Sequence, residues 1–148
     1  MLLKRDRALM AVEIVLDVAF HAGRTADATG AADIAERLGA QRRGIEPVLQ
    51  ALTRAGLLDS TRGPRGGYRL ARAPRAIPLV EAVEAVLDAE DAAPPAGALS
   101  AAVTAPLWAE LDATLREKLA QLTVGDLLRR ATQAGLRRPL TEPLDFAI

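Results

Sequence analysis

Arginines and glycines are concentrated in the stretch TRGPRGGYRLAR, residues 61–72. An arginine presents a planar set of donors that fits phosphate oxygens or the paired acceptors of guanine. Glycines let the backbone approach a phosphate closely or enter a narrow minor groove, which attracts positive charge. The stretch therefore predicts a nucleic-acid contact made by Arg62, Gly63, Arg65 and Gly66. The alternative is a solvated basic turn.

A second group of side chains suited to reading bases lies in QRRGIE, residues 41–46. Arginine can pair with guanine, glutamine with adenine, and glutamate can accept a hydrogen bond from the amino group of cytosine. A helix fits the major groove and presents its first residues to base edges there. Base contacts are therefore expected from Gln41, Arg42, Arg43 and Glu46.

Pro47 limits where such a helix can begin. Proline has no backbone N–H and is tolerated only in the first turn of a helix. We therefore expect the regular helix to begin near Gly44, with Arg42 and Arg43 in the turn that leads into it.

The elements that would position these residues can be predicted from periodicity and turn residues. Apolar residues at helical spacing predict helices over 6–21, within 31–40 and over 43–55. Short extended segments on either side of the glycine-rich turn predict a β-hairpin. A helix-turn-helix followed by a hairpin is a winged helix, in which Tyr68 is expected to pack the wing onto the helices with its hydroxyl within reach of phosphate.

The second half of the chain is expected to be helical over 78–88, 107–122 and 124–134, with a loop over 89–105 and Pro106 in the first turn of its helix. The helix after Pro106 carries an apolar stripe that a small chain cannot easily cover alone, which predicts a two-fold dimer. The stripe consists of Leu107, Leu111, Leu115, Leu119 and Leu122, with Trp108 alongside as a packing residue at the dimer seam.

The predicted fold class is thus mainly α, a winged helix-turn-helix with a small two-stranded wing followed by a long dimerisation helix. The expected organisation is a DNA-binding domain over 1–75, a linking helix and loop over 76–105, dimerisation helices over 106–134 and an irregular tail over 135–148.

Charge and composition narrow the classes of function. The chain of 148 residues has no net charge, yet residues 1–75 carry 13 Lys or Arg against 8 Asp or Glu, which indicates a polyanion partner. There is no cysteine, which excludes disulfides and a thiolate-held iron–sulfur cluster and fits a cytoplasmic protein. Neither a membrane span nor a signal peptide is expected. The single histidine, His21, has no nucleophile motif nearby, and no phosphate-binding loop is present, so an enzyme is not expected.

The chain resembles the IscR-type (Rrf-two) family of bacterial winged-helix regulators. The motifs that carry the resemblance occur in family order over nearly the whole chain: LDVAFHAG, AADIAERLGA, VLQALTRAGLL, RGPRGGYRLAR, IPLVEAVEAV and PLWAELDATLREKLAQLTVGDLL. The resemblance implies a homodimer that binds partly palindromic operator DNA and controls transcription, with the long helix crossing to the partner subunit. It also implies that Glu46 matches a family position that contacts bases.

Two departures from the family matter. Cluster-sensing members hold their cluster with cysteines before the long helix, where this chain has DAEDAAPPAGALSAAVTAP, so no cofactor is expected. Gly44 stands where several relatives have a bulky residue. The expected function is that of a homodimeric DNA-binding regulator that represses transcription. Two alternatives remain. One is a winged-helix module that binds proteins, and the other is a sensor that holds a small-molecule effector through residues other than cysteine.

Overall fold

The computed structural model describes residues 6–22, 28–87 and 97–139. Helix α1 (Arg7–His21) lies at its centre and packs against α2, α3, α4, α6 and β2. Asp6 caps its first turn, because the carboxylate accepts hydrogen bonds from the backbone amides of Ala8 at 3.0 Å and Leu9 at 3.4 Å. The inner face of α1, which includes Ile14 and Val18, is buried in the core.

Helices α2 (Ala31–Leu38) and α3 (Arg42–Arg54) form the predicted helix-turn-helix. Gly39 ends α2 in the left-handed conformation, with φ of 64°, which glycine adopts without strain. The prediction that the regular helix begins near Gly44 is wrong, because α3 begins at Arg42 and Pro47 lies inside it. The Gly44 amide donates to the Gln41 carbonyl at 2.9 Å and closes a turn upstream of the proline. Pro47 is exposed, so water can serve the carbonyl that its missing N–H leaves unpaired.

The wing is an antiparallel hairpin of β1 (Leu58–Thr61) and β2 (Gly67–Leu70), as the sequence predicted. Its tip needs a glycine at position 66, since a Cβ there would lie 2.4 Å from the carbonyl oxygen of Thr61. On the edge of β2 away from β1, Thr29 exchanges two backbone hydrogen bonds with Tyr68, at 2.9 and 2.8 Å. The wing is therefore joined to the segment that leads into α2.

Helices α4 (Leu79–Val86) and α6 (Val124–Gln133) close the body on the other side of α1. The backbone before α4 runs antiparallel to the backbone before α6: the amide of Leu79 donates to the carbonyl of Leu122 at 2.8 Å, and that of Val124 to Ile77 at 3.0 Å. Thr123 and Asp126 form a capping box at the start of α6.

Helix α5 (Ala105–Gln121) carries Pro106 in its first turn, as predicted. The expected loop over 89–105 is wrong over its last part, because Ser100–Thr104 forms a π-helical turn, η2, that runs directly into α5. The amide of Ala105 donates to the carbonyl of Ser100, five residues back. The wider turn is explained by Pro106, which has no donor and whose ring crowds the carbonyl four residues before it. The part of the expected loop at 89–96 lies outside the described residues.

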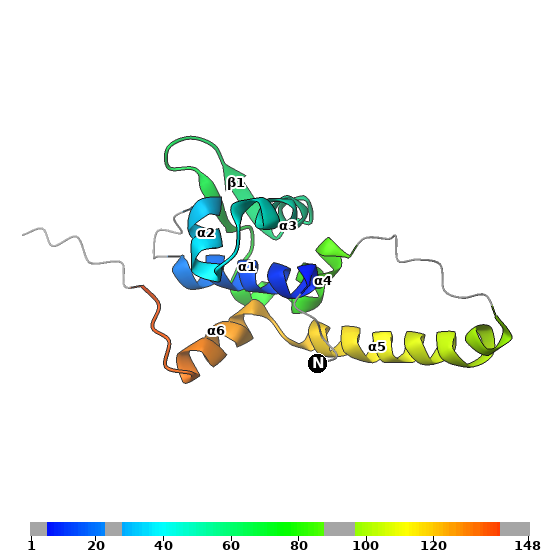
Figure 1. Cartoon of the computed structure of the whole chain (residues 1–148). Coiled ribbons are helices and arrows are strands. Elements are labelled where there is room, and N and C mark those ends of the chain that lie inside the picture. Colours follow the sequence, from blue (N-terminus) through cyan, green and yellow to red (C-terminus); the bar gives the residue numbers. More distant parts are fainter. Residues whose placement is uncertain (1–5, 23–27, 88–96, 140–148) are drawn as a thin grey trace, which may run out of the picture.

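Figure 1 shows the arrangement of these elements. The wing and α3 lie on one side of α1, while α5 and α6 lie on the other, and α5 extends well beyond the body. The predicted fold class, a mainly helical winged helix with a two-stranded wing, is confirmed. Among the described residues, no helix is long and apolar enough to cross a membrane.

Candidate nucleic-acid interface

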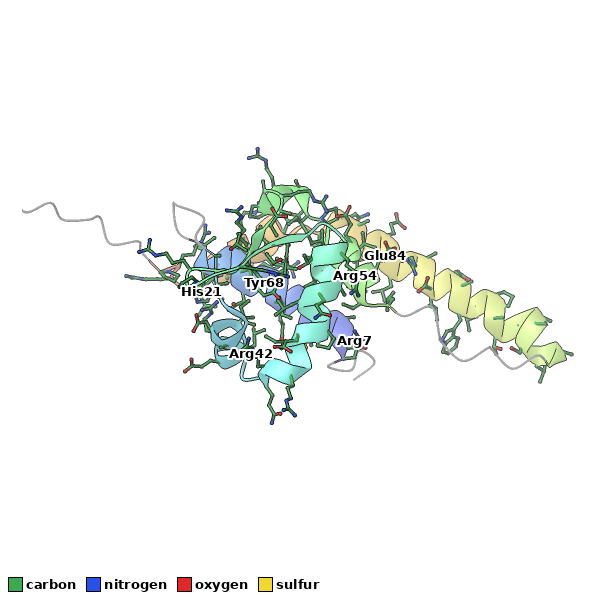
Figure 2. The ribbon with its side chains drawn as sticks, turned by 90° about the horizontal axis from the view of Figure 1, so that it is seen from above. Arg7, His21, Arg42, Arg54, Tyr68 and Glu84 are labelled. Carbon is green, nitrogen blue, oxygen red and sulfur yellow. The ribbon has the colours of Figure 1, made fainter. Side chains whose placement is uncertain are left out.

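The N-terminal end of α3 presents the predicted base-reading residues to solvent. Gln41, Arg42 and Arg43 are exposed, whereas Ile45 and Val48 on the inner face of the helix are buried. Figure 2 shows Arg42 at the end of α3 that lies next to α2. The inner face thus fixes the helix to the core and leaves its first turn free to enter a groove of DNA.

Glu46 lies one helical turn beyond Arg42, and the two side chains form an ion pair. The Nε of Arg42 donates to Oε1 of Glu46 at 3.1 Å. The pair is exposed, so it contributes little to stability. Its position matters more, because it places a cation and a carboxylate side by side on the surface that would face base edges.

The wing tip places Arg62 and Arg65 in solvent. Gly63 has a φ of 105°, a conformation that other residues adopt only with strain, and Gly66 has no room for a side chain. A hollow of about 550 Å³ separates the tip from the start of α2, and its lining includes Arg65 and Gly30. The tip therefore stands away from α2 and is free to contact a ligand.

Tyr68 is half-buried and packs against the hydrophobic core from β2. The packing role predicted for it is confirmed. Its contact with phosphate stays a prediction, as do the DNA contacts of the other site residues.

Periodicity did not reveal a side-chain cluster beneath this surface. Asp17 of α1, whose side chain is 6% exposed, is the one charged residue among the buried side chains of the described chain. Arg37 of α2 binds it with two nitrogens, through Nε at 3.0 Å from Oδ1 and Nη2 at 2.8 Å from Oδ2. The same Nη2 donates to the hydroxyl of Thr29 at 2.9 Å. His21 adds a contact from Nδ1 to Oδ1 of Asp17 at 3.2 Å.

The charge of this cluster is well compensated. The hydrogen bond to Asp17 raises the pKa of Arg37, against the opposing effect of its partial burial. Nδ1 of His21 lies beside two oxygens of Asp17, the carboxylate Oδ1 and the backbone carbonyl at 3.0 Å, and both of these can accept a hydrogen bond. The only signal in the sequence was a charged residue within the apolar stretch IVLDVAF.

The apolar stripe on α5 divides into two parts. Leu119 of α5 is half-buried and packs against the core of its own chain. So does Leu122, which follows the last residue of the helix and is extended, so the stripe on the helix itself ends before it. The rest of the stripe is exposed: Leu107 by 43%, Trp108 by 67%, Leu111 by 53% and Leu115 by 43%. Arg116 ties the base of α5 to α4 through an ion pair with Glu84.

The helix-turn-helix, the glycine-rich wing and the exposed arginines on both define a winged-helix DNA-binding protein. The model of the Rrf2 family, described as "Iron-dependent Transcriptional regulator", matches residues 5–130. The chain therefore belongs to the Rrf2 family of transcriptional regulators, and the resemblance noted in the sequence is confirmed.

Known relatives agree with this assignment. The chain is 33% identical to the HTH-type transcriptional regulator IscR of Vibrio campbellii (strain ATCC BAA-1116), over 80% of this chain and 73% of the relative. Two solved structures are similar. T. potens IscR has a TM-score of 0.73 and 28% identity, covering 93% of this chain and 94% of that chain. CymR (YrzC), the global cysteine regulator of B. subtilis, has a TM-score of 0.68 and 26% identity, covering 88% and 98%. These relatives are regulators of transcription, in agreement with the expectation that the chain is not an enzyme.

The family description names iron, but the residues of this chain do not fit a cysteine-held cluster. The sequence contains no cysteine, so no thiolate ligand exists anywhere in the chain. Within residues 6–22, 28–87 and 97–139, no three His, Asp or Glu side chains are grouped to hold a metal ion.

Proposed function

We propose that this chain is a sequence-specific repressor of transcription that acts in the cytoplasm as a homodimer on a partly palindromic operator, without a cysteine-ligated cluster. One observation carries the proposal. Two groups of exposed arginines, at the start of α3 and at the wing tip, lie on one side of the body, and the exposed apolar face of α5 lies on the other.

The two basic groups suit two different grooves. The start of α3 would enter the major groove with Gln41, Arg42, Arg43 and Glu46 at base edges. The wing would follow the backbone or the adjacent minor groove with Arg62, Gly63, Arg65 and Gly66, and Tyr68 would hold it in place. Arginines at both points would neutralise phosphates and give the complex a strong dependence on salt.

Dimerisation would cover α5. A helix of 17 residues is about 25 Å long. Its exposed part carries Leu107, Trp108, Leu111 and Leu115, whereas Leu119 and Leu122 would join the body of each subunit to the seam. In this proposal residues 1–75 bind DNA, 76–105 link, and 106–134 pair the subunits. Repression follows because a dimer that covers operator DNA excludes other proteins from the same base pairs.

The proposal is tested by titrating labelled DNA with the protein at several salt concentrations. Two sets of DNA are compared: genomic fragments of the source organism that the protein retains, and shuffled fragments of equal length. We expect tighter binding to the selected fragments and a log affinity that falls with log salt by about 0.9 per neutralised phosphate. Equal, salt-insensitive binding to both sets would contradict operator reading and favour a module that binds proteins.

A further inference from the structure

The buried carboxylate of Asp17 lies where α1 packs against α2. It is held by Arg37 in a two-pronged contact, with Nε also 3.2 Å from Oδ2. Such planar contacts fix the guanidinium in orientation as well as in position. Because Asp17 belongs to α1, at the centre of the body, and Arg37 to α2, the pair locks the last turn of α2 onto α1.

The same guanidinium also reaches the wing. Its Nη2 donates to the hydroxyl of Thr29, whose backbone amide and carbonyl are both bonded to Tyr68 of β2. Contact between these segments is close, since a Cβ on Gly67 would lie 2.4 Å from the carbonyl oxygen of Thr29. A shift of Thr29 must therefore be followed by β2, and β2 leads directly to the wing tip.

From this continuous set of contacts we infer that Thr29 and Arg37 are positioning residues. They hold the wing in the position from which Arg62 and Arg65 contact DNA while the start of α3 contacts bases in the major groove. The inference rests on the proposed function, because it assumes that the wing contacts DNA. Neither residue has to touch DNA itself. Thr29 acts through Tyr68, and Arg37 acts through Thr29.

The hydroxyl of Thr29 is the contact that can be removed with least disturbance. Thr29→Val keeps the shape and β-branching of the side chain, the two backbone bonds to Tyr68 and the Arg37–Asp17 pair, and it removes only the acceptor for Nη2. Thr29→Ser keeps the hydroxyl and should restore wild-type behaviour. Thr132→Val is the matched control, because the hydroxyl of Thr132 bonds a carbonyl of its own helix, Leu128, at 3.2 Å.

The test is a double-mutant cycle of DNA affinity that combines Arg65→Ala with each of these variants. Arg65→Ala should weaken binding roughly tenfold in the wild-type and Thr132→Val backgrounds, the size of one charge-assisted hydrogen bond. In the Thr29→Val background it should weaken binding by less than about threefold, because the wing is no longer held at its contact. Amide exchange over the wing, residues 61–68, should be faster in Thr29→Val and unchanged in Thr29→Ser.

The outcomes separate the inference from the proposed function. If Arg65→Ala weakens binding equally in the wild-type and Thr29→Val backgrounds, the wing contacts DNA but Thr29 does not position it, and the inference is overturned. If Arg65→Ala leaves wild-type affinity unchanged, the wing contact fails and the inference falls with it. Should Thr29→Val lose its helical circular dichroism, Thr29→Ala takes its place in the same cycle.

Discussion

In α3 the Nε of Arg42 lies 3.1 Å from Oε1 of Glu46, so the carboxylate that would read a base is already held by a neighbouring cation. To accept a hydrogen bond from cytosine, Glu46 must share its two oxygens between the base and Arg42. A carboxylate has room for this, since it can accept several hydrogen bonds. The pair can therefore act together, with Arg42 orienting Glu46 in the groove.

Glu46→Ala should change base preference more than affinity. We expect it to relax the preference at one position per half-site by about 1–3 kcal/mol, because a base-edge contact is lost. It should bind random DNA at least as tightly as the wild type, since it removes a negative charge close to the DNA and frees Arg42. Competition binding against operators substituted at each position measures both effects. An unchanged preference at every position would show that Glu46 reads no base.

Arg65→Ala should weaken binding to operator and random DNA alike and flatten the salt dependence by about one phosphate. The physical reason is that an arginine at an exposed tip meets backbone charge, which does not depend on sequence. Arg130→Ala is the control, because this exposed arginine belongs to α6 on the opposite side of the body. Wild-type affinity and salt dependence for Arg65→Ala would mean that the wing is only a basic turn.

Leu111→Glu should convert a dimer into a monomer and leave the body folded. The side chain is 53% exposed within its own chain, so a charge there disturbs the proposed seam and not the core. Ala113→Glu, on the opposite face of the same helix, should leave the dimer intact. Light scattering at tens of micromolar measures the mass. A monomeric wild-type chain at that concentration contradicts the proposed assembly.

Gly67→Ala should destabilise the fold by about 1–3 kcal/mol, because φ is 154° and the added Cβ would overlap the backbone of Thr29. Gly44→Ala is a matched control with the opposite expectation. Position 44 lies inside α3 with open space around it, so alanine should stabilise by about 0.5–1 kcal/mol. Thermal unfolding of both variants measures these changes. Equal melting temperatures for Gly67→Ala and Gly44→Ala would contradict the close contact at Gly67.

Anaerobic reconstitution with iron and sulfide should give no stable cluster, since the chain has no thiolate. Absorbance after gel filtration is the measurement. A stoichiometric chromophore that survives the column would show that other residues hold a cluster.

Local signals in the sequence were sufficient for most of the fold. Apolar spacing predicted the helices, and a glycine-rich turn between two short extended segments predicted the wing. The start of α3 could not be predicted, because a turn closed by Gly44 outweighed the usual rule for proline. The π-helical turn before α5 could not be predicted either, because it lies in a stretch whose residue types suggest a loop.

The site was only partly visible in the sequence. Exposed arginines on a turn and at a helix start can be found by type and spacing. The contacts among Asp17, Arg37 and Thr29 cannot, because they join residues far apart in sequence and leave no periodic trace. The buried charge within IVLDVAF indicated that a partner must exist, but not which residue it would be.

The way α5 is attached to the rest of the chain has a consequence for the amount of protein in the cell. The helix is joined to the body at its C-terminal end, by Leu119, Leu122 and the Arg116–Glu84 pair, and a lone helix of this length is marginal in water. In the proposed dimer, the folding of α5 would therefore be coupled to the association of the subunits. The melting temperature would then rise with protein concentration. At low protein concentration the chains would be monomeric and α5 would be accessible to proteases. The regulator would therefore be degraded at low concentration and preserved at high concentration. Its own expression level would then set a threshold for occupying DNA.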